Sequence, residues 1–144
     1  MEDLQKSLLQ INSIDEVCHY LNTFLKQYST AHTDKKIIFV TGVITSDGPE
    51  HVEENRKKLF TATECIRSKT DGFVFCWEHI FTDGVKARIN YNEIPYEDFL
   101  VCSKDIIESC VLTDVYMTYG WERSTGARLE HDTALTKKIP VHYI

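Results

Sequence analysis

The sequence lacks two features that would place the protein in a membrane or on nucleic acid. Its apolar runs are short, and none approaches the roughly 20 residues that a membrane-spanning helix needs. It has no excess of basic residues, because 16 Lys and Arg face 22 Asp and Glu, for a net charge of −6. A broad basic surface that follows a phosphate backbone is therefore missing, and we expect neither nucleic acid nor a membrane as a partner.

The cysteines form no familiar motif. There are five, an odd number, and no two are spaced as CxxC. No group of Cys and His has the ligand spacing of a zinc site, so we expect no bound metal. The pattern favours free, buried thiols in a reducing compartment. The segment Met1 to Leu4 is acidic, unlike the basic start of a signal peptide, and the expected location is cytoplasmic.

Common nucleotide-binding and hydrolase motifs are also missing. The chain contains neither G-x-G-x-x-G nor G-x-x-x-x-G-K-[ST], so dinucleotide and P-loop binding lose their main sequence support. No serine lies in a G-x-S-x-G turn, which disfavours an α/β-hydrolase. A small phosphorylated ligand stays open, because the N-terminus of a helix binds phosphate without a net positive charge.

What the sequence does contain is an alternation of strand and helix patterns over 144 residues, the length of one domain. Strands are predicted over 37–43, 72–77, 111–117 and 139–144, and helices over about 50–67, 95–110 and 126–137. Residues 78–94 are predicted as a long loop. This order predicts a parallel sheet with helices on both faces and a ligand beyond the carboxyl ends of the strands.

Residues 1–35 are predicted as a helical extension that precedes a domain of residues 36–144. Ser13 to Glu16 has the pattern of a capping box, and apolar residues then recur every three or four positions as far as Tyr28. The amphipathic helix either closes a dimer or caps the sheet, and the sequence leaves both open.

Glu130 is the first candidate for chemistry. Ala127 and Ala134 are its neighbours on one face of the predicted helix, which suggests close packing there. A carboxylate on a packed face is costly unless it is paired, protonated or functional. The alternative is a surface glutamate favoured by the nearby helix N-terminus, and spacing alone does not decide between the two.

Four further residues are candidates around Glu130. Arg123, Ser124 and the free amides of Gly126 and Ala127 together form a site that receives an anion. The alternatives are a solvated loop charge for Arg123 and a simple helix cap for Ser124.

Four segments together resemble the nucleoside 2-deoxyribosyltransferase-like superfamily. The most specific runs from Gly120 to Glu130 and is similar to a G-W-E-x-S-x-G-A-R-x-E element. Phe39 to Thr45 is similar to a first strand with a glycine turn at Gly42. Tyr96 to Ile106 is similar to a W-E-D-Y-x…R-D-I helix. Ile139 to Val141 is similar to a last strand. The resemblance covers about residues 36–144.

The resemblance implies an α/β, flavodoxin-like, doubly wound sheet of about five parallel strands. Enzymes of this superfamily cleave the N-glycosidic bond of nucleosides or nucleotides, need no metal or organic cofactor, and are generally homo-oligomers. Glu130 matches the nucleophile that forms a covalent glycosyl ester. Asp105, otherwise an ordinary acid on a helix surface, matches the residue that contacts or protonates the leaving base.

Two positions bear on substrate and activity within that resemblance. Ser124, six residues before Glu130, matches the phosphate-binding serine of 2′-deoxynucleoside 5′-phosphate N-hydrolases, which favours a nucleoside monophosphate. Phe39 stands where active members usually carry a tyrosine whose hydroxyl steadies the nucleophile, so that hydrogen bond is lost. The glycine- and arginine-rich opening loop is also lacking, and Lys86 or Arg88 is a candidate to replace it.

Three hypotheses follow from the sequence. The first is a nucleotide or nucleoside N-glycosidase or deoxyribosyltransferase with Glu130 as nucleophile. The second is a nucleotide-binding module of the same fold that is catalytically weak or inactive, which Phe39 favours. The third is a protein–protein module that acts through residues 1–30.

Overall fold

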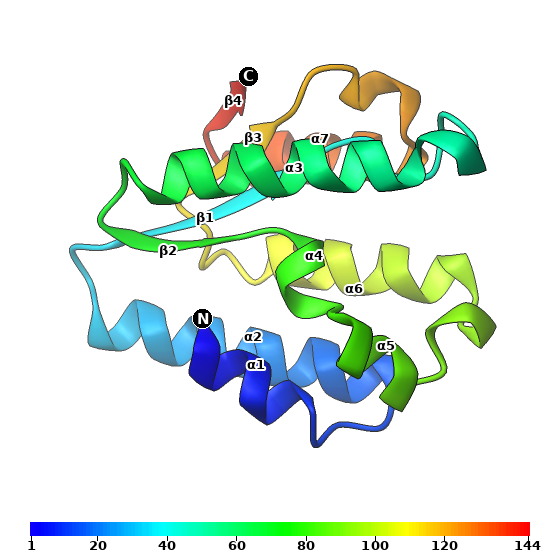
Figure 1. Cartoon of the computed structure of the whole chain (residues 1–144). Helices are drawn as coiled ribbons and strands as arrows, with labels where there is room; N and C mark the ends of the chain where they lie inside the picture. The colour runs from blue at the N-terminus through cyan, green and yellow to red at the C-terminus, as the bar shows by residue number, and fades with distance from the viewer.

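The structure, a computed structural model, describes all 144 residues. Four parallel strands form one sheet in the order β2-β1-β3-β4, with helices on both sides (Figure 1). The strands are β1 (Lys36–Thr41), β2 (Gly72–Phe75), β3 (Asp114–Met117) and β4 (Val141–Tyr143). The predicted α/β, flavodoxin-like doubly wound fold is confirmed, with the four strands that the apolar runs predict and not the five that the resemblance implies.

Helices connect the strands. They are α1 (Glu2–Leu8), α2 (Ile14–Ala31), α3 (Val52–Arg67), α4 (Trp77–Ile80), α5 (Asp83–Arg88), α6 (Tyr96–Glu108) and α7 (Thr125–Thr136). In Figure 1, α3 lies on one side of the sheet and α1, α2 and α6 lie on the other. None of the helices combines the length and the apolar composition that crossing a bilayer requires.

The predicted long loop at 78–94 is wrong, because two short helices occupy much of it. Thr82 caps α5 by accepting a hydrogen bond from the amide of Val85. Val85 and Ile89 are buried in the main core, so this segment is packed against the rest of the molecule. Its short helical turns have too few residues to show the periodicity by which a helix is predicted.

The side chains of β1 alternate between two cores. Ile37 and Phe39 belong to a core of 23 buried residues, which includes side chains of α1, α2, α6 and α7. Ile38 and Val40 belong to a smaller core with Leu59 of α3. This alternation is the two-residue period of a strand that is covered on both faces.

The N-terminal helices form part of the larger core. Leu4, Leu8, Val17, Leu21 and Leu25 are all buried there. Of the two alternatives for the amphipathic helix, the structure therefore shows the one in which it caps the sheet. Residues 1–35 and the sheet share one core.

A disulfide links these helices to the rest of the chain. Cys18 of α2 is bonded to Cys102 of α6, with 5.6 Å between their Cα atoms. Cys76 is free and buried, whereas Cys65 and Cys110 are free and exposed. The expectation of free, buried thiols thus holds for Cys76 alone. The disulfide depends on how α2 packs against α6, and the exposure of Cys65 and Cys110 depends on where they lie on the fold. The spacing of cysteines in the sequence predicts neither.

Candidate functional site

A cavity of about 320 Å³ opens where the strands end. Thr41 and Gly42 line it from the end of β1, Trp77 follows β2, and Ser124 lies beyond β3. Residues of α6 and α7 complete the wall. A ligand was expected at this edge of the sheet, and the volume lies near the lower end of the range for small-molecule sites, about 300–1,000 Å³.

Gly42 allows two strand ends to approach each other beside the cavity. A Cβ atom at this position would clash with the side chain of Thr118, which follows β3. Any other residue at 42 would therefore push the segment after β3 away from the end of β1. Gly42 lines the cavity, as expected, and its missing side chain keeps that edge compact.

Glu130 lies in the second turn of α7, and its side chain is only 4% exposed. Its Oε2 accepts a hydrogen bond from the hydroxyl of Thr41. Its Oε1 accepts from Nε1 of Trp77 at 3.0 Å and from the hydroxyl of Ser103 at 2.7 Å. An ionised carboxylate accepts about four hydrogen bonds, so one acceptor position remains on Oε2. The alternative of an exposed surface glutamate is excluded.

Two opposing effects act on the pKa of Glu130. Burial raises it above the ordinary value, because the charged form loses its hydration in the interior. The hydrogen bonds from Thr41, Trp77 and Ser103 act in the opposite direction, because they stabilise the carboxylate. Burial is the larger effect. A carboxyl group with a raised pKa, held in one orientation beside a cavity, is a candidate functional group.

Phe39 does not line the cavity. It is buried beneath the indole of Trp77, with 5.4 Å between the ring centroids. The hydroxyl groups that reach Glu130 come instead from Thr41 and Ser103. Thr41 follows Phe39 by two residues and so faces the same side of β1. Phe39 therefore supports the site from below.

Asp105 also lies outside the cavity, so nothing in the cavity geometry supports the expectation that it contacts the leaving base, which stays a prediction. Its side chain is exposed, whereas Cys102 and Ser103 of the same helix line the cavity. Two positions along an α-helix differ by about 200° around its axis, which turns Asp105 away from the direction of Ser103. Ser103 is the residue of α6 that meets Glu130.

The start of α7 gives the cavity a polar end. Ser124 caps the helix, and its Oγ accepts a hydrogen bond of 3.2 Å from the amide of Ala127. The hydroxyl proton of Ser124 therefore remains free to donate. Gly126 also lines the cavity, close to the hydroxyl of Tyr96. A Cβ atom at Gly126 would lie 2.9 Å from that hydroxyl, so glycine makes this approach possible.

Arg123 is exposed and does not line the cavity. Its Nε and one terminal nitrogen donate to the two carboxylate oxygens of Asp47, at 2.8 and 3.0 Å. The guanidinium holds the pKa of Asp47 below its ordinary value. This pair joins the loops after β1 and β3. Of the four residues predicted to receive an anion, Ser124, Gly126 and Ala127 line the cavity and Arg123 does not. Lys86 and Arg88, the candidates to replace the missing opening loop, do not line it either.

The segment after β2 supplies residues that sequence reasoning missed. Trp77 contacts Phe81, and Phe81 clusters with Tyr91 and Phe99 on the cavity wall, with 4.8–5.5 Å between neighbouring ring centroids. Glu78 lines the cavity directly after Trp77. The available signal was their place after a buried strand, at the edge of the sheet where ligands bind.

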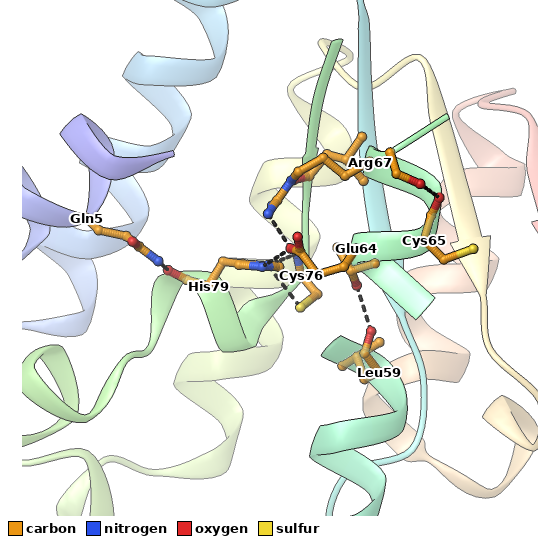
Figure 2. Close-up of polar contacts among 10 residues, drawn as sticks. Gln5, Leu59, Glu64, Cys65, Arg67, Cys76 and His79 are labelled. Atoms are coloured by element: carbon orange, nitrogen blue, oxygen red, sulfur yellow. Dashed lines mark hydrogen bonds and ion pairs between the residues drawn. The ribbon is translucent and has the colours of Figure 1, made fainter. Parts of the chain in front are cut away.

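A chain of polar contacts holds this segment from behind (Figure 2). The amide and the thiol of Cys76 lie 3.3 and 3.2 Å from Nδ1 of His79, and Nε2 of His79 lies 3.0 Å from Oε1 of Glu64. Gln5 of α1 donates to the carbonyl of His79 at 3.0 Å. Burial raises the pKa of Cys76 and lowers that of His79, so both stay neutral. Neither lines the cavity, and together they fix the turn that carries Trp77.

The fold and the site define a flavodoxin-like α/β protein with a buried, hydrogen-bonded glutamate beside a cavity of about 320 Å³. Residues 35–143 match the family model described as "Domain of unknown function (DUF4406)", and the chain belongs to this family. No curated protein and no solved structure matches the chain.

Proposed function

We propose that the protein cleaves the N-glycosidic bond of a nucleoside 5′-monophosphate or a nucleoside, by hydrolysis or by transfer to a second base. The observation that carries the proposal is Glu130, buried beside the cavity with one acceptor position open on Oε2. The resemblance of residues 120–130 to the nucleoside 2-deoxyribosyltransferase-like superfamily supports the class of reaction. A homodimer or larger assembly in the cytoplasm belongs to the same proposal.

The reaction proceeds in two displacements at C1′ of the sugar. Oε2 of Glu130 attacks C1′, and the electron pair of the C1′–N bond leaves with the base. The product is a glycosyl ester of Glu130. Water or a second base then attacks C1′ and releases the carboxylate. The donors Thr41, Trp77 and Ser103 hold Glu130 in one orientation and stabilise the carboxylate as it leaves.

The two ends of the cavity suit the two ends of a nucleotide. The aromatic rings of Trp77, Phe81 and Tyr91 offer faces and edges on which a flat base packs. The start of α7 offers the Ser124 hydroxyl to a phosphate, and the positive end of the helix favours the charge.

A second candidate is a nucleotide-binding module of the same fold with weak or no turnover. Phe39 favours it, because a tyrosine hydroxyl is missing at that position. Arg123 is paired with Asp47 and no cationic side chain lines the cavity, which weighs against a phosphate in either candidate and leaves a free nucleoside as the ligand to compare. Thr41 and Ser103 favour the enzyme, because they supply the hydroxyl groups that Phe39 lacks.

Base release distinguishes these candidates. Ribonucleosides, 2′-deoxynucleosides and their 5′-monophosphates are incubated with the protein, and free base is separated by chromatography. Release from monophosphates, weakened selectively by Ser124→Asp, supports a nucleotide N-glycosidase. Release from free nucleosides alone overturns the phosphate site and leaves the reaction class intact. No release, with a nucleotide still raising the melting temperature, overturns the enzyme and supports the binding module.

A further inference from the structure

The cavity has a second acidic residue on its wall, Glu78, which separates it from a neighbouring hollow lined by Glu53, Arg56 and Asp83. Among the residues that line the cavity, only Glu78 and Glu130 carry a carboxyl group. Glu78 begins α4 directly after Trp77, and the indole of Trp77 donates to Glu130. Enzymes that cleave glycosidic bonds with retention generally use two carboxyl groups, one as nucleophile and one as acid and then base. Asp105, which the resemblance assigned to the leaving base, is exposed outside the cavity.

The contacts of Glu78 engage one oxygen and leave the other available. Oε2 accepts a hydrogen bond of 2.8 Å from Nε of Arg56 and lies 3.9 Å from Nζ of Lys86. Oε1 has no hydrogen-bond partner in the protein. Oε1 is also not fully buried. A fully buried side-chain oxygen without a hydrogen-bond partner occurs only at Oδ1 of Asn22. Oε1 is therefore free to meet a ligand, while Oε2 anchors the group.

The surroundings of Glu78 act on its pKa in both directions, and burial is the largest effect. Its side chain is 16% exposed, and burial raises its pKa above the ordinary value. The charged and titratable groups near it are Glu53 and Arg56 of α3, Asp83 and Lys86 of α5, and Tyr91. Glu53 and Asp83 act in the same direction as burial, and Arg56 opposes them. A carboxyl group whose pKa is raised keeps its proton to a higher pH than an exposed glutamate does.

We propose that Glu78 is the general acid that protonates the leaving base and the general base that then activates water. This role rests on the proposed N-glycosidase function. In the first step, the proton of Glu78 moves to a ring nitrogen of the base while the C1′–N bond breaks and Oε2 of Glu130 bonds to C1′. In the second step, the carboxylate of Glu78 takes a proton from water, the water oxygen bonds to C1′, and the ester electron pair returns to Glu130.

The test compares Glu78→Gln with wild type on two kinds of leaving base. An unmodified purine needs a proton to leave, whereas an N7-methylpurine already carries a positive charge and leaves without one. General acid catalysis contributes about 10²–10⁴-fold, so we expect Glu78→Gln to slow release of the unmodified base by about 100-fold or more and of the methylated base by less than about threefold. Glu108→Gln, at the exposed end of α6 and outside the cavity lining, is the control and should leave both rates unchanged.

The pH profile gives an independent readout. The wild-type rate on an unmodified base falls as pH rises through the pKa of Glu78, because the acid loses its proton, and Glu78→Gln lacks this fall. Unchanged rates in Glu78→Gln, or an equal loss with both bases, would overturn the role of Glu78 while the glycosidase stands. A wild-type protein that releases no base from any substrate of the nucleoside and nucleotide panel would instead overturn the glycosidase and this role with it. Should Glu78→Gln fail to fold, Glu78→Asp is compared on the same two bases with the same criteria.

Discussion

The indole Nε1 of Trp77 donates a hydrogen bond of 3.0 Å to Oε1 of Glu130, 53 residues further along the chain. This hydrogen bond links the segment after β2, which contains Glu78, to α7, which contains Glu130. Phe39 supports the indole from the core. The orientation of Glu130 therefore depends on a residue from another element, and that dependence can be measured.

Trp77→Phe removes this hydrogen bond and keeps an aromatic ring in the cavity wall. A hydrogen bond to a charged group contributes about 1.5–3 kcal/mol, so we expect base release to slow about 10- to 100-fold. The pKa of Glu130 should rise further, because one donor to its carboxylate is lost. Trp121→Phe is the matched control, because Trp121 stacks on His131 and does not line the cavity. Equal rates in the two variants would show that the indole hydrogen bond has no part in the reaction.

Glu130→Gln should stabilise the protein in a pH-dependent way. The amide oxygen of glutamine accepts from Trp77 and Ser103, and its NH₂ group donates to the hydroxyl of Thr41. In the wild type the pKa of Glu130 is higher in the folded state than the ordinary value of 4.5. Above pH 4.5 the folded state therefore binds more protons than the unfolded state. The free energy of unfolding then falls as pH rises toward the folded pKa.

Melting temperatures at pH 5 and pH 8 check this sign. We expect Glu130→Gln to melt above wild type by several degrees at pH 8, where 1 kcal/mol corresponds to about 2–4 °C in a domain of this size. The difference should be smaller at pH 5. Glu122→Gln, at an exposed position of the same segment, should show no such trend. A difference that is the same at both pH values would contradict the raised pKa of Glu130.

Leu25→Ala should destabilise the fold although Leu25 lies outside residues 36–144. Leu25 is fully buried in the core that also contains Phe39. A Leu→Ala change in such a position costs about 2–5 kcal/mol, because it removes apolar contacts and leaves a cavity. Denaturant titration measures this cost, with the exposed Gln27→Ala on the same helix as control. Equal stability of the two variants would mean that α2 does not belong to the core.

Alkylation followed by mass spectrometry tests the arrangement of the cysteines. Without reductant, the folded protein should react at Cys65 and Cys110, and unfolding should add Cys76. Cys18 and Cys102 should react only after reduction, which we expect to lower stability by about 2–4 kcal/mol. Five alkylated cysteines without reductant would contradict the disulfide and would match the reducing cytoplasm that the sequence predicts.

The order of elements was predictable because buried parallel strands are continuous apolar runs. Phe73 to Phe75, for example, is apolar throughout and buried throughout. The burial of Glu130 was one of two interpretations of the sequence. The small residues Ala127 and Ala134 indicated close packing around it, and both are buried, but spacing alone also allowed a surface glutamate. Local patterns of this kind fix which face of a strand or helix is covered.

The partners of Glu130 were not predictable in the same way. Thr41, Trp77 and Ser103 lie 89, 53 and 27 positions away from it in the chain, and only the folded sheet brings them together. Asp105 shows the converse. Its place in a matching motif suggested a site residue, but the rotation of α6 points Ser103 inward and leaves Asp105 exposed. Helix phase relative to the sheet depends on packing, which a single segment does not reveal.

The most direct measurement is the rate of base release by Glu130→Gln beside wild type, with any substrate that the nucleoside and nucleotide panel identifies. Glutamine keeps the shape and the hydrogen bonds of residue 130 and removes its nucleophilic oxygen, so the variant should remain folded. We expect the wild type to release base and Glu130→Gln to release none, with a melting temperature at least as high as that of the wild type. Base release by the folded variant at the wild-type rate would contradict the role of Glu130 as the nucleophile.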